Sequence, residues 1–185
     1  MTIEFENILT VSNDFKELIR TWRNSKHVSQ YMITDHYITK KEHEQWIEKL
    51  KTQTTTKAWI IFYNRKPIGL VSLSNFDTKK KSTEWGFYIA DESARGKGIG
   101  STALFMLMKY VFDALLFHTM KTSVLENNPQ AIQLYKKFGF TEDETQKQHL
   151  KRNGKIINII TMSTSRNTWE CVKGTIQPLQ ASDIV

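Results

Sequence analysis

Cysteine is almost absent from this sequence, because Cys171 is the only one among 185 residues. A lone cysteine cannot form an internal disulfide or a cysteine-based zinc site, so we expect no bound metal. No apolar run reaches the length of about 20 residues that a membrane helix needs. The chain begins with an acidic, alternating segment, whereas a signal peptide has a basic start and an apolar core. We therefore expect a cytoplasmic protein without a membrane partner.

Acidic residues are in the minority, since 26 Lys and Arg against 19 Asp and Glu leave a net charge of +7. A basic balance attracts anions, either nucleic acid or phosphorylated small molecules. The one basic run, Lys79-Lys80-Lys81, carries no interleaved aromatic residues and is typical of a solvated loop. We therefore expect no nucleic-acid partner and favour a phosphorylated small molecule.

Alternating or apolar segments predict strands, and segments with helical spacing predict helices. The predicted strands cover residues 3–8, 58–63, 68–76, 83–90, 120–125, 141–150 and 155–162, with a hairpin turn at Asn153-Gly154. The predicted helices start at Ser12 or Asn13 and at the capping box of Thr39 and Glu42, and two more cover residues 101–117 and 129–138. This order indicates an α+β fold with a mixed, mostly antiparallel sheet flanked by helices. We expect one domain over residues 1–163 and a polar, loosely ordered tail over residues 164–185.

A glycine-rich loop, Arg95-Gly96-Lys97-Gly98-Ile99-Gly100, joins a predicted strand to a long predicted helix. Glycines let the backbone turn tightly and approach a ligand closely. The free N–H groups and the dipole of the following helix favour an anion at this point. The spacing differs from that of a P-loop and from the Gly-x-Gly-x-x-Gly of dinucleotide folds. The loop is a candidate phosphate site, and a connection that binds nothing is the alternative.

Two motifs carry a resemblance to a known family. Arg95-x-x-Gly98-x-Gly100 resembles the Gln/Arg-x-x-Gly-x-Gly/Ala signature of the GNAT acetyltransferases. Asn128-x-x-Ala131-x-x-x-Tyr135-x-x-x-Gly139-Phe140 resembles their second motif, which lies on a later helix. The resemblance runs from the first strand to the last hairpin. It implies the GNAT acyl-CoA N-acyltransferase fold and an acetyl-CoA-dependent N-acetyltransferase.

The resemblance also implies roles for individual residues. It assigns cofactor binding to Arg95, Gly96, Lys97, Gly98, Ile99, Gly100 and Ser101 in the loop, to Tyr88, Ile89 and Ala90 on the preceding strand, and to Asn128, Ala131 and Tyr135 on the later helix. Tyr135 matches the family tyrosine that protonates the leaving thiolate. Taken without the resemblance, Tyr135 could equally be a core aromatic residue, and Asn128 could be a plain helix cap.

The general base is less clearly marked. Glu84 lies inside the strand before the loop, where alternation places it on one face with Gly86 and Tyr88. A carboxylate there is a candidate to take the proton of the amine, and a solvated strand residue is the equal alternative. Glu126 is a second candidate, although it could simply serve the start of the next helix. Some relatives need no dedicated base, because a sugar amine is only weakly basic.

The resemblance implies that the amino-terminal helices and nearby loops select the acceptor, as they do in this superfamily. Their residues closely resemble the acetyltransferases of pseudaminic acid biosynthesis, which act on the 4-amino group of a UDP-linked 4-amino-4,6-dideoxy sugar. This resemblance implies substrate binding by Arg23, Asn24, Tyr31, Met32 and His43. The opening Trp22-Arg23-Asn24 also occurs, more loosely, in acetyltransferases of ribosomal proteins and of polyamines.

The charges of this region separate the candidate acceptors. A polyamine site needs a cluster of carboxylates, whereas cations and aromatic rings suit a UDP-sugar. The region carries Arg20, Arg23, Lys26 and several aromatic residues, so we favour a nucleotide-linked amino sugar as the small-molecule partner. A protein acetyltransferase with a peptide groove and a non-catalytic acetyl-CoA-binding module remain alternatives. An edge strand at the last hairpin would allow a homodimer.

Overall fold

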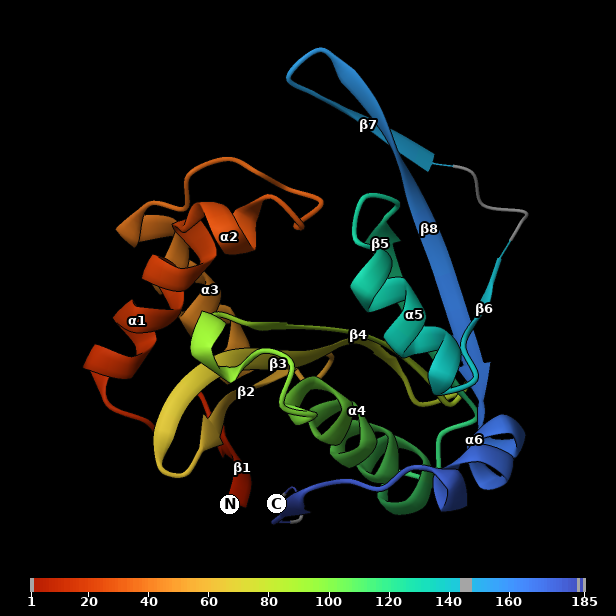
Figure 1. The fold of residues 1–185 in the computed structure, drawn as a ribbon. Helices are drawn as coiled ribbons and strands as arrows, with labels where there is room; N and C mark the ends of the chain where they lie inside the picture. Colours follow the sequence, from red (N-terminus) through yellow and green to blue (C-terminus); the bar gives the residue numbers. More distant parts are fainter. Residues whose placement is uncertain (1, 144–147, 183, 185) are drawn as a thin grey trace.

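The computed structural model describes residues 2–143, 148–182 and 184 of the chain, and Figure 1 shows their arrangement. In chain order the strands are β1 (Thr2–Asn7), β2 (Lys57–Tyr63), β3 (Lys66–Asp77), β4 (Ser82–Ile89), β5 (Thr119–Leu125), β6 (Thr141–Glu142), β7 (Gln148–Arg152), β8 (Lys155–Ser165) and β9 (Gln180–Ala181). The helices are α1 (Asn13–Asn24), α2 (Lys26–Ser29), α3 (Lys40–Thr52), α4 (Ile99–Lys109), α5 (Pro129–Lys137) and α6 (Arg166–Val172). Short turns of other helix types are η1 (Glu92–Ala94), η2 (Tyr110–Ala114) and η3 (Lys173–Thr175).

The strands form one mixed sheet in the order β6-β8-β5-β4-β3-β2-β1-β9, and β7 adds to β8. The pairs β4·β5 and β1·β9 are parallel, and the other pairs are antiparallel. The predicted α+β fold with a mostly antiparallel mixed sheet is therefore confirmed. Among the described residues, no helix is both long and apolar enough to cross a bilayer, and no group of three or more His, Cys, Asp or Glu side chains could hold a metal ion.

The sheet divides between β4 and β5. Their parallel register joins Ser82 to Thr119 and ends with Glu84 opposite Lys121. Beyond this point β4 continues to Ile89 and β5 to Leu125 along diverging paths (Figure 1). The second half of β4 therefore presents one backbone edge to a gap in the sheet.

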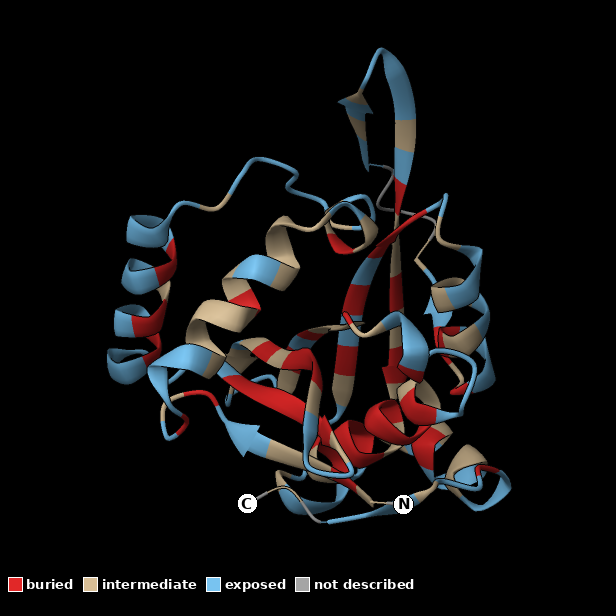
Figure 2. Ribbon diagram, turned by 60° about the vertical axis from the view of Figure 1, so that its left-hand side comes forward, coloured by how far each residue is buried: buried red, intermediate tan, exposed pale blue. Residues whose placement is uncertain are grey.

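Helices cover both faces of the sheet and give two hydrophobic clusters. Ile19 of α1 and Ile47 of α3 pack with Ile60 of β2 on one face. The other cluster includes Ile61 of β2 and Leu107 of α4. Because both faces of β2 are buried, its sequence is a continuous apolar run. Figure 2 shows the buried residues concentrated in the sheet and on the sheet-facing sides of the helices.

The carboxyl-terminal segment corrects the sequence prediction. Strand β8 crosses the expected boundary at residue 163 and ends at Ser165, whose side chain caps α6. Trp169 of α6 is 0% exposed, and its Nε1 donates a hydrogen bond to Asp113 Oδ1 at 2.9 Å. Strand β9 then pairs with β1. The prediction of a loosely ordered tail is therefore wrong for the described residues, because Trp169 and Ile176 anchor this segment to the core.

Other element predictions differ in detail. The long helix begins at Ile99 and changes at Tyr110 into the π-helical turn η2, so it is not one α-helix over residues 101–117. The hairpin turn at Asn153-Gly154 is confirmed, and both residues have the positive φ that the sequence pair favours. Residues 144–147 of the predicted strand 141–150 lie outside the described residues.

Candidate active site

A cavity of about 540 Å³ lies where β4 and β5 separate, under the segment that links α2 to α3. Its walls are formed by Ile19, Arg23, Tyr31, Met32, Ile33, Thr34, Ile38, Glu42, His43 and Trp46 from the amino-terminal part, and by Leu70, Ser72, Gly86, Phe87, Tyr88, Thr122, Ser123, Val124, Asn128 and Tyr135 from the sheet and α5. The cavity thus brings four predicted acceptor residues next to three predicted cofactor residues.

The backbone of β4 has two different edges. The N–H of Ala90 donates to the Ile68 carbonyl of β3 at 2.7 Å. Backbone groups alternate in direction along a strand, so those of Trp85, Phe87 and Ile89 face the gap. In agreement, the Trp85 carbonyl accepts a hydrogen bond from Thr122 Oγ1 of β5 at 3.0 Å. The gap-facing groups next along the strand belong to Phe87 and Ile89, and an extended ligand could pair with them as a further strand does.

The glycine loop has the geometry of an anion site. Gly96 and Gly98 have φ of +74° and +77°, and a Cβ at either position would meet nothing within 4 Å. Gly98 caps α4, and the Thr102 N–H donates to its carbonyl at 3.0 Å. The N–H groups of Ile99, Gly100 and Ser101 precede that bond and have no partner within the helix. The loop therefore offers helix-terminal donors beside open space, as a phosphate requires.

The loop and the cavity are neighbours rather than one surface, since no loop residue lines the cavity. A Cβ at Gly100 would lie 3.6 Å from the Phe87 ring, and Phe87 lines the cavity. Arg95 lies beside the end of β4, with Nη2 3.5 Å from the Ile89 carbonyl, and Lys97 is exposed. The predicted cofactor residues of the loop therefore lie next to the end of β4 and to Phe87, which lines the cavity.

Tyr135 lies on α5 and is 5% exposed. Its ring packs edge-on against Trp85 with centroids 5.0 Å apart, and it lines the cavity. Burial raises the pKa of the phenol above its ordinary value, so the hydroxyl is protonated at neutral pH. Tyr135 is therefore both a core aromatic residue and an available proton donor at the cavity.

The two other predicted residues of α5 differ in position. Asn128 lines the cavity, and its Oδ1 also accepts a hydrogen bond from the Ala131 N–H at 3.3 Å. The interpretation of Asn128 as a helix cap is thus confirmed, and it does not exclude contact with a ligand. Ala131 does not line the cavity and packs at the edge of the core.

Arg23 of α1 lies in the part of the cavity wall that the amino-terminal segment forms. Its Nη2 donates to the carbonyl and to Oγ1 of Thr34, the latter at 2.7 Å. Its Nη1 is buried and has no hydrogen-bond partner among the described residues. Burial lowers the pKa of Arg23, but a guanidinium stays charged at neutral pH. The half-buried Arg23 therefore carries one covered donor, unpaired within the described part of the structure, at the wall of the cavity.

His43 of α3 also lines the cavity and is 7% exposed. Burial lowers the pKa of His43. A hydrogen bond to the Lys16 backbone raises the pKa, but by less. Its Nε2 has no hydrogen-bond partner in the described part of the chain. The side chain is thus a buried, largely neutral imidazole with an unpaired nitrogen.

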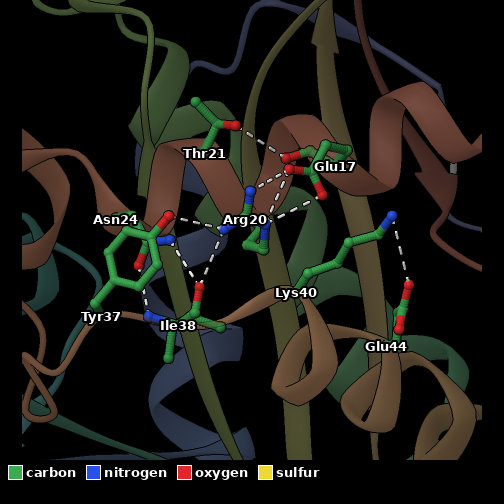
Figure 3. Close-up of polar contacts among 8 residues, drawn as sticks. All are labelled: Glu17, Arg20, Thr21, Asn24, Tyr37, Ile38, Lys40 and Glu44. Carbon is green, nitrogen blue, oxygen red and sulfur yellow. Dashed lines mark hydrogen bonds and ion pairs between the residues drawn. The ribbon is translucent and has the colours of Figure 1, made fainter.

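Asn24 has a different position from the one predicted. Its amide group pairs with the backbone of Ile38, accepting from the N–H at 2.8 Å and donating to the carbonyl at 2.9 Å. Arg20 donates to the same carbonyl and to the Tyr37 hydroxyl, as Figure 3 shows. Asn24 does not line the cavity. Asn24 instead holds Ile38, which does line the cavity.

Neither carboxylate considered as a base lines the cavity. Glu84 is exposed on β4 beside Lys121. Glu126 accepts hydrogen bonds from the backbone and side chain of Asn158, at 2.8 and 2.7 Å, and so joins the end of β5 to β8. Among the described residues, Glu42 is the carboxylate that lines the cavity. The sequence predicted for Glu42 only a place in the capping box.

Sequence reasoning missed other wall residues, including Ser72, Thr122 and Ser123. Each lies within a strand with no motif around it, so no local signal marks it. Their position depends on where β4 and β5 separate. That point is a property of the sheet and not of any one segment.

Comparisons with known proteins agree with this geometry. The family described as Acetyltransferase (GNAT) domain matches residues 8–141. The acetyltransferase PseH of Campylobacter jejuni strain 81-176 is 32% identical over 139 residues, which cover 75% of this chain and 85% of that protein. The spermidine N(1)-acetyltransferase of Vibrio cholerae is 28% identical over 126 residues, covering 68% of this chain and 72% of the relative.

Two solved structures share the fold. The spermidine N-acetyltransferase of Vibrio cholerae in complex with CoA and spermine superposes with a TM-score of 0.81 at 21% identity, covering 91% of this chain and 98% of that one. Campylobacter jejuni PseH in complex with acetyl coenzyme A gives a TM-score of 0.65 at 23% identity, covering 88% and 98%.

Proposed function

Because the chain belongs to the GNAT acetyltransferases, a family of acetyl-CoA-dependent N-acetyltransferases, we propose that its acceptor is the 4-amino group of a UDP-linked 4-amino-4,6-dideoxy sugar. This reaction is a step of pseudaminic acid biosynthesis. The observation that carries the proposal is the wall of the cavity, where the half-buried guanidinium of Arg23 and aromatic rings accompany Glu42, the one carboxylate among the described wall residues. The similarity to PseH supports the same choice.

The residues of the loop and of β4 fit acetyl-CoA. The pyrophosphate would be held by the N–H groups of Ile99, Gly100 and Ser101, because these are the first residues of α4 and lie beside open space. The pantetheine arm would be held by the gap-facing backbone of Phe87 and Ile89. When bound, acetyl-CoA supplies the acetyl group as a thioester.

Tyr135 is the general acid in this proposal. Its raised pKa means that the phenol carries its proton at neutral pH, and we assign it to donate this proton to the departing thiolate. The Phe87 N–H faces the gap and is the donor we assign to the carbonyl oxygen as negative charge develops there. Glu84 and Glu126 lie away from the cavity, and a weakly basic sugar amine is largely neutral without a carboxylate base.

The charges in the cavity favour a nucleotide sugar over a polyamine. Both oxygens of Glu42 already have partners, Oε2 with Thr39 at 2.7 Å and Oε1 with His36 at 3.3 Å. A polycation would have to approach the positive charge of the half-buried Arg23, and the described wall offers no free carboxylate to balance it. The diphosphate of a UDP-sugar would instead use the unpaired Nη1 of Arg23. Tyr31 and Trp46 offer ring faces to the uracil or the sugar.

Spermidine is the second candidate acceptor, because the Vibrio cholerae enzyme is 28% identical. Release of the CoA thiol from acetyl-CoA would be measured with the UDP-linked 4-amino sugar, with spermidine and with amino-terminal peptides. We expect the highest kcat/KM with the UDP-sugar, and the variant Tyr135→Phe as the inactive control. Turnover of spermidine or a peptide, without turnover of the sugar, would overturn the choice of acceptor.

A further inference from the structure

We propose that Arg152, on the hairpin formed by β7 and β8, is a positioning residue that shapes the acceptor side of the cavity. Arg152 does not line the cavity. It acts through the segment of residues 30–35, four of which do line it. The identity of the acceptor rests on the proposed function, whereas the positioning role concerns the protein alone.

The contacts of Arg152 converge on one short segment. Its Nη1 donates to the Gln30 carbonyl at 2.9 Å, and its Nη2 donates to the carbonyls of Met32 at 2.7 Å and Ile33 at 3.4 Å. Its Nε lies 2.8 Å from Asp35 Oδ2, which makes an ion pair by distance, although the angle is not that of a hydrogen bond. The side chain is only 11% exposed. One guanidinium therefore holds three backbone carbonyls and a carboxylate from a part of the chain more than a hundred residues away.

This segment has little other means of keeping its shape. Residues 31–39 form neither helix nor strand. Among the described residues, backbone hydrogen bonds hold the start of this segment, from the N–H groups of Tyr31 and Met32 to carbonyls of α2 at 3.1 Å each. Side chains hold the rest: Arg23 holds Thr34, Asn24 holds Ile38, and Arg152 holds the part in between. Because Tyr31, Met32 and the two residues after them form the cavity wall, their placement depends on these few contacts.

The hairpin also has contacts of its own that fix its shape. It projects from the body of the protein (Figure 1), and Ile156 near its tip is 67% exposed. Its turn and register follow from Asn153-Gly154 and from the β7·β8 pairing. A guanidinium is suited to this task, because its planar fork can bond several oxygens at once.

Arg152 also affects the charge available to a ligand. The charge of Asp35 raises the pKa of Arg23 and that of Arg152 lowers it, so the three groups lie close enough to interact. With Arg152 paired to Asp35, the Nη1 of Arg23 keeps no partner among the described residues. Arg152 therefore shares Asp35 with Arg23, and this leaves Nη1 of the half-buried Arg23 without a hydrogen-bond partner in the described part of the chain.

The test compares Arg152→Ala and Arg152→Lys with Lys151→Ala, an exposed neighbour on the same strand. Hydrogen exchange would be measured on the full-length proteins, peptide by peptide. Arg152→Ala should exchange faster in residues 30–38, by ~10-fold or more, with α4 and α5 unchanged. Arg152→Lys should lie between, because an ammonium cannot replace the fork, and Lys151→Ala should match the parent protein.

Kinetics supply a second readout. With the UDP-linked 4-amino sugar, Arg152→Ala should raise the acceptor KM by ~10-fold or more, while calorimetry shows acetyl-CoA affinity within about twofold. Unchanged exchange in residues 30–38, or equally faster exchange throughout α4 and α5 with loss of acetyl-CoA binding, would overturn the positioning role. If the parent protein does not turn over the sugar, the proposed function fails, and the exchange result still decides the role of Arg152.

Discussion

Thr122 Oγ1 of β5 donates a hydrogen bond to the Trp85 carbonyl of β4 at 3.0 Å, just beyond the last paired residues of the two strands. The side-chain hydroxyl takes the place of the backbone donor that a continuing parallel pair would provide. Both residues are buried, so water cannot satisfy the Trp85 carbonyl. This bond therefore closes the end of the gap in which the cofactor arm is proposed to lie.

Thr122→Val should destabilise the fold. Valine keeps the shape of threonine but removes the donor, and an unsatisfied buried carbonyl costs about 1–3 kcal/mol of unfolding free energy. Thr122→Ser retains the hydroxyl and is the matched control, expected to lose less. Urea denaturation monitored by tryptophan fluorescence measures both. A valine variant as stable as the parent protein would show that the bond contributes nothing.

Tyr135→Phe should reduce turnover and leave the fold intact. Phenylalanine keeps the ring contact with Trp85, so stability should change little. Loss of the general acid should lower kcat by ~100-fold or more, with acetyl-CoA affinity nearly unchanged by calorimetry. If kcat stays within a few-fold of the parent value, another group protonates the thiolate.

Gly98→Ala should weaken acetyl-CoA binding. The added Cβ meets no protein atom, so the cost to folding is backbone strain at φ +77°, about 1–2 kcal/mol. The methyl group would occupy the open space beside the helix-terminal donors, and we expect a ~10-fold higher Kd for acetyl-CoA. Gly174→Ala, which also meets nothing within 4 Å, is the control away from the loop. Native affinity of Gly98→Ala in calorimetry would refute the loop assignment.

His43 should make the protein less stable in mild acid. Burial lowers its pKa in the folded state, so the unfolded chain binds a proton more readily. The stability contributed by neutral His43 is present above the unfolded pKa of about 6.5 and is lost as pH falls toward the folded value.

The measurement is the free energy of unfolding at pH 7.5 and at pH 5.5. In His43→Gln the decrease between these values should be smaller than in the parent protein, whatever its absolute stability. His149→Gln, at an exposed position of β7, should behave as the parent protein does. An identical decrease in all three proteins would contradict a buried neutral imidazole at position 43.

The parts of the fold that follow from local chemistry could be predicted. The capping box of Thr39 and Glu42, the Asn153-Gly154 turn and the glycines before α4 are each determined by neighbouring residues. The separation of β4 from β5 could not be predicted. It depends on where two segments more than thirty residues apart stop pairing.

The same distinction applies to the candidate site. Tyr135 and Arg23, to which the family resemblance assigns roles, both line the cavity, and each belongs to a motif on one helix. Glu84 was considered because a carboxylate inside a strand is unusual, but its position in the sheet leaves it exposed. The burial of Trp169 could not be predicted, because buried residues that are isolated in a polar segment give no periodic pattern. The contacts of Arg152 could not be predicted, because its partners lie more than a hundred residues away in the sequence.

Strand β2 places consecutive side chains in opposite cores. Ile60 packs in the cluster under α1 and α3, and Ile61 packs in the cluster with α4. A shift of β2 by one residue would exchange every one of these side chains between the two clusters. The first cluster supports the residues predicted to bind the acceptor, and the second supports the glycine loop. A shift in the register of this one strand would therefore move these two parts of the candidate site relative to each other. Changes of side-chain size in β2 are therefore constrained from two directions, even though no residue of β2 touches the cavity.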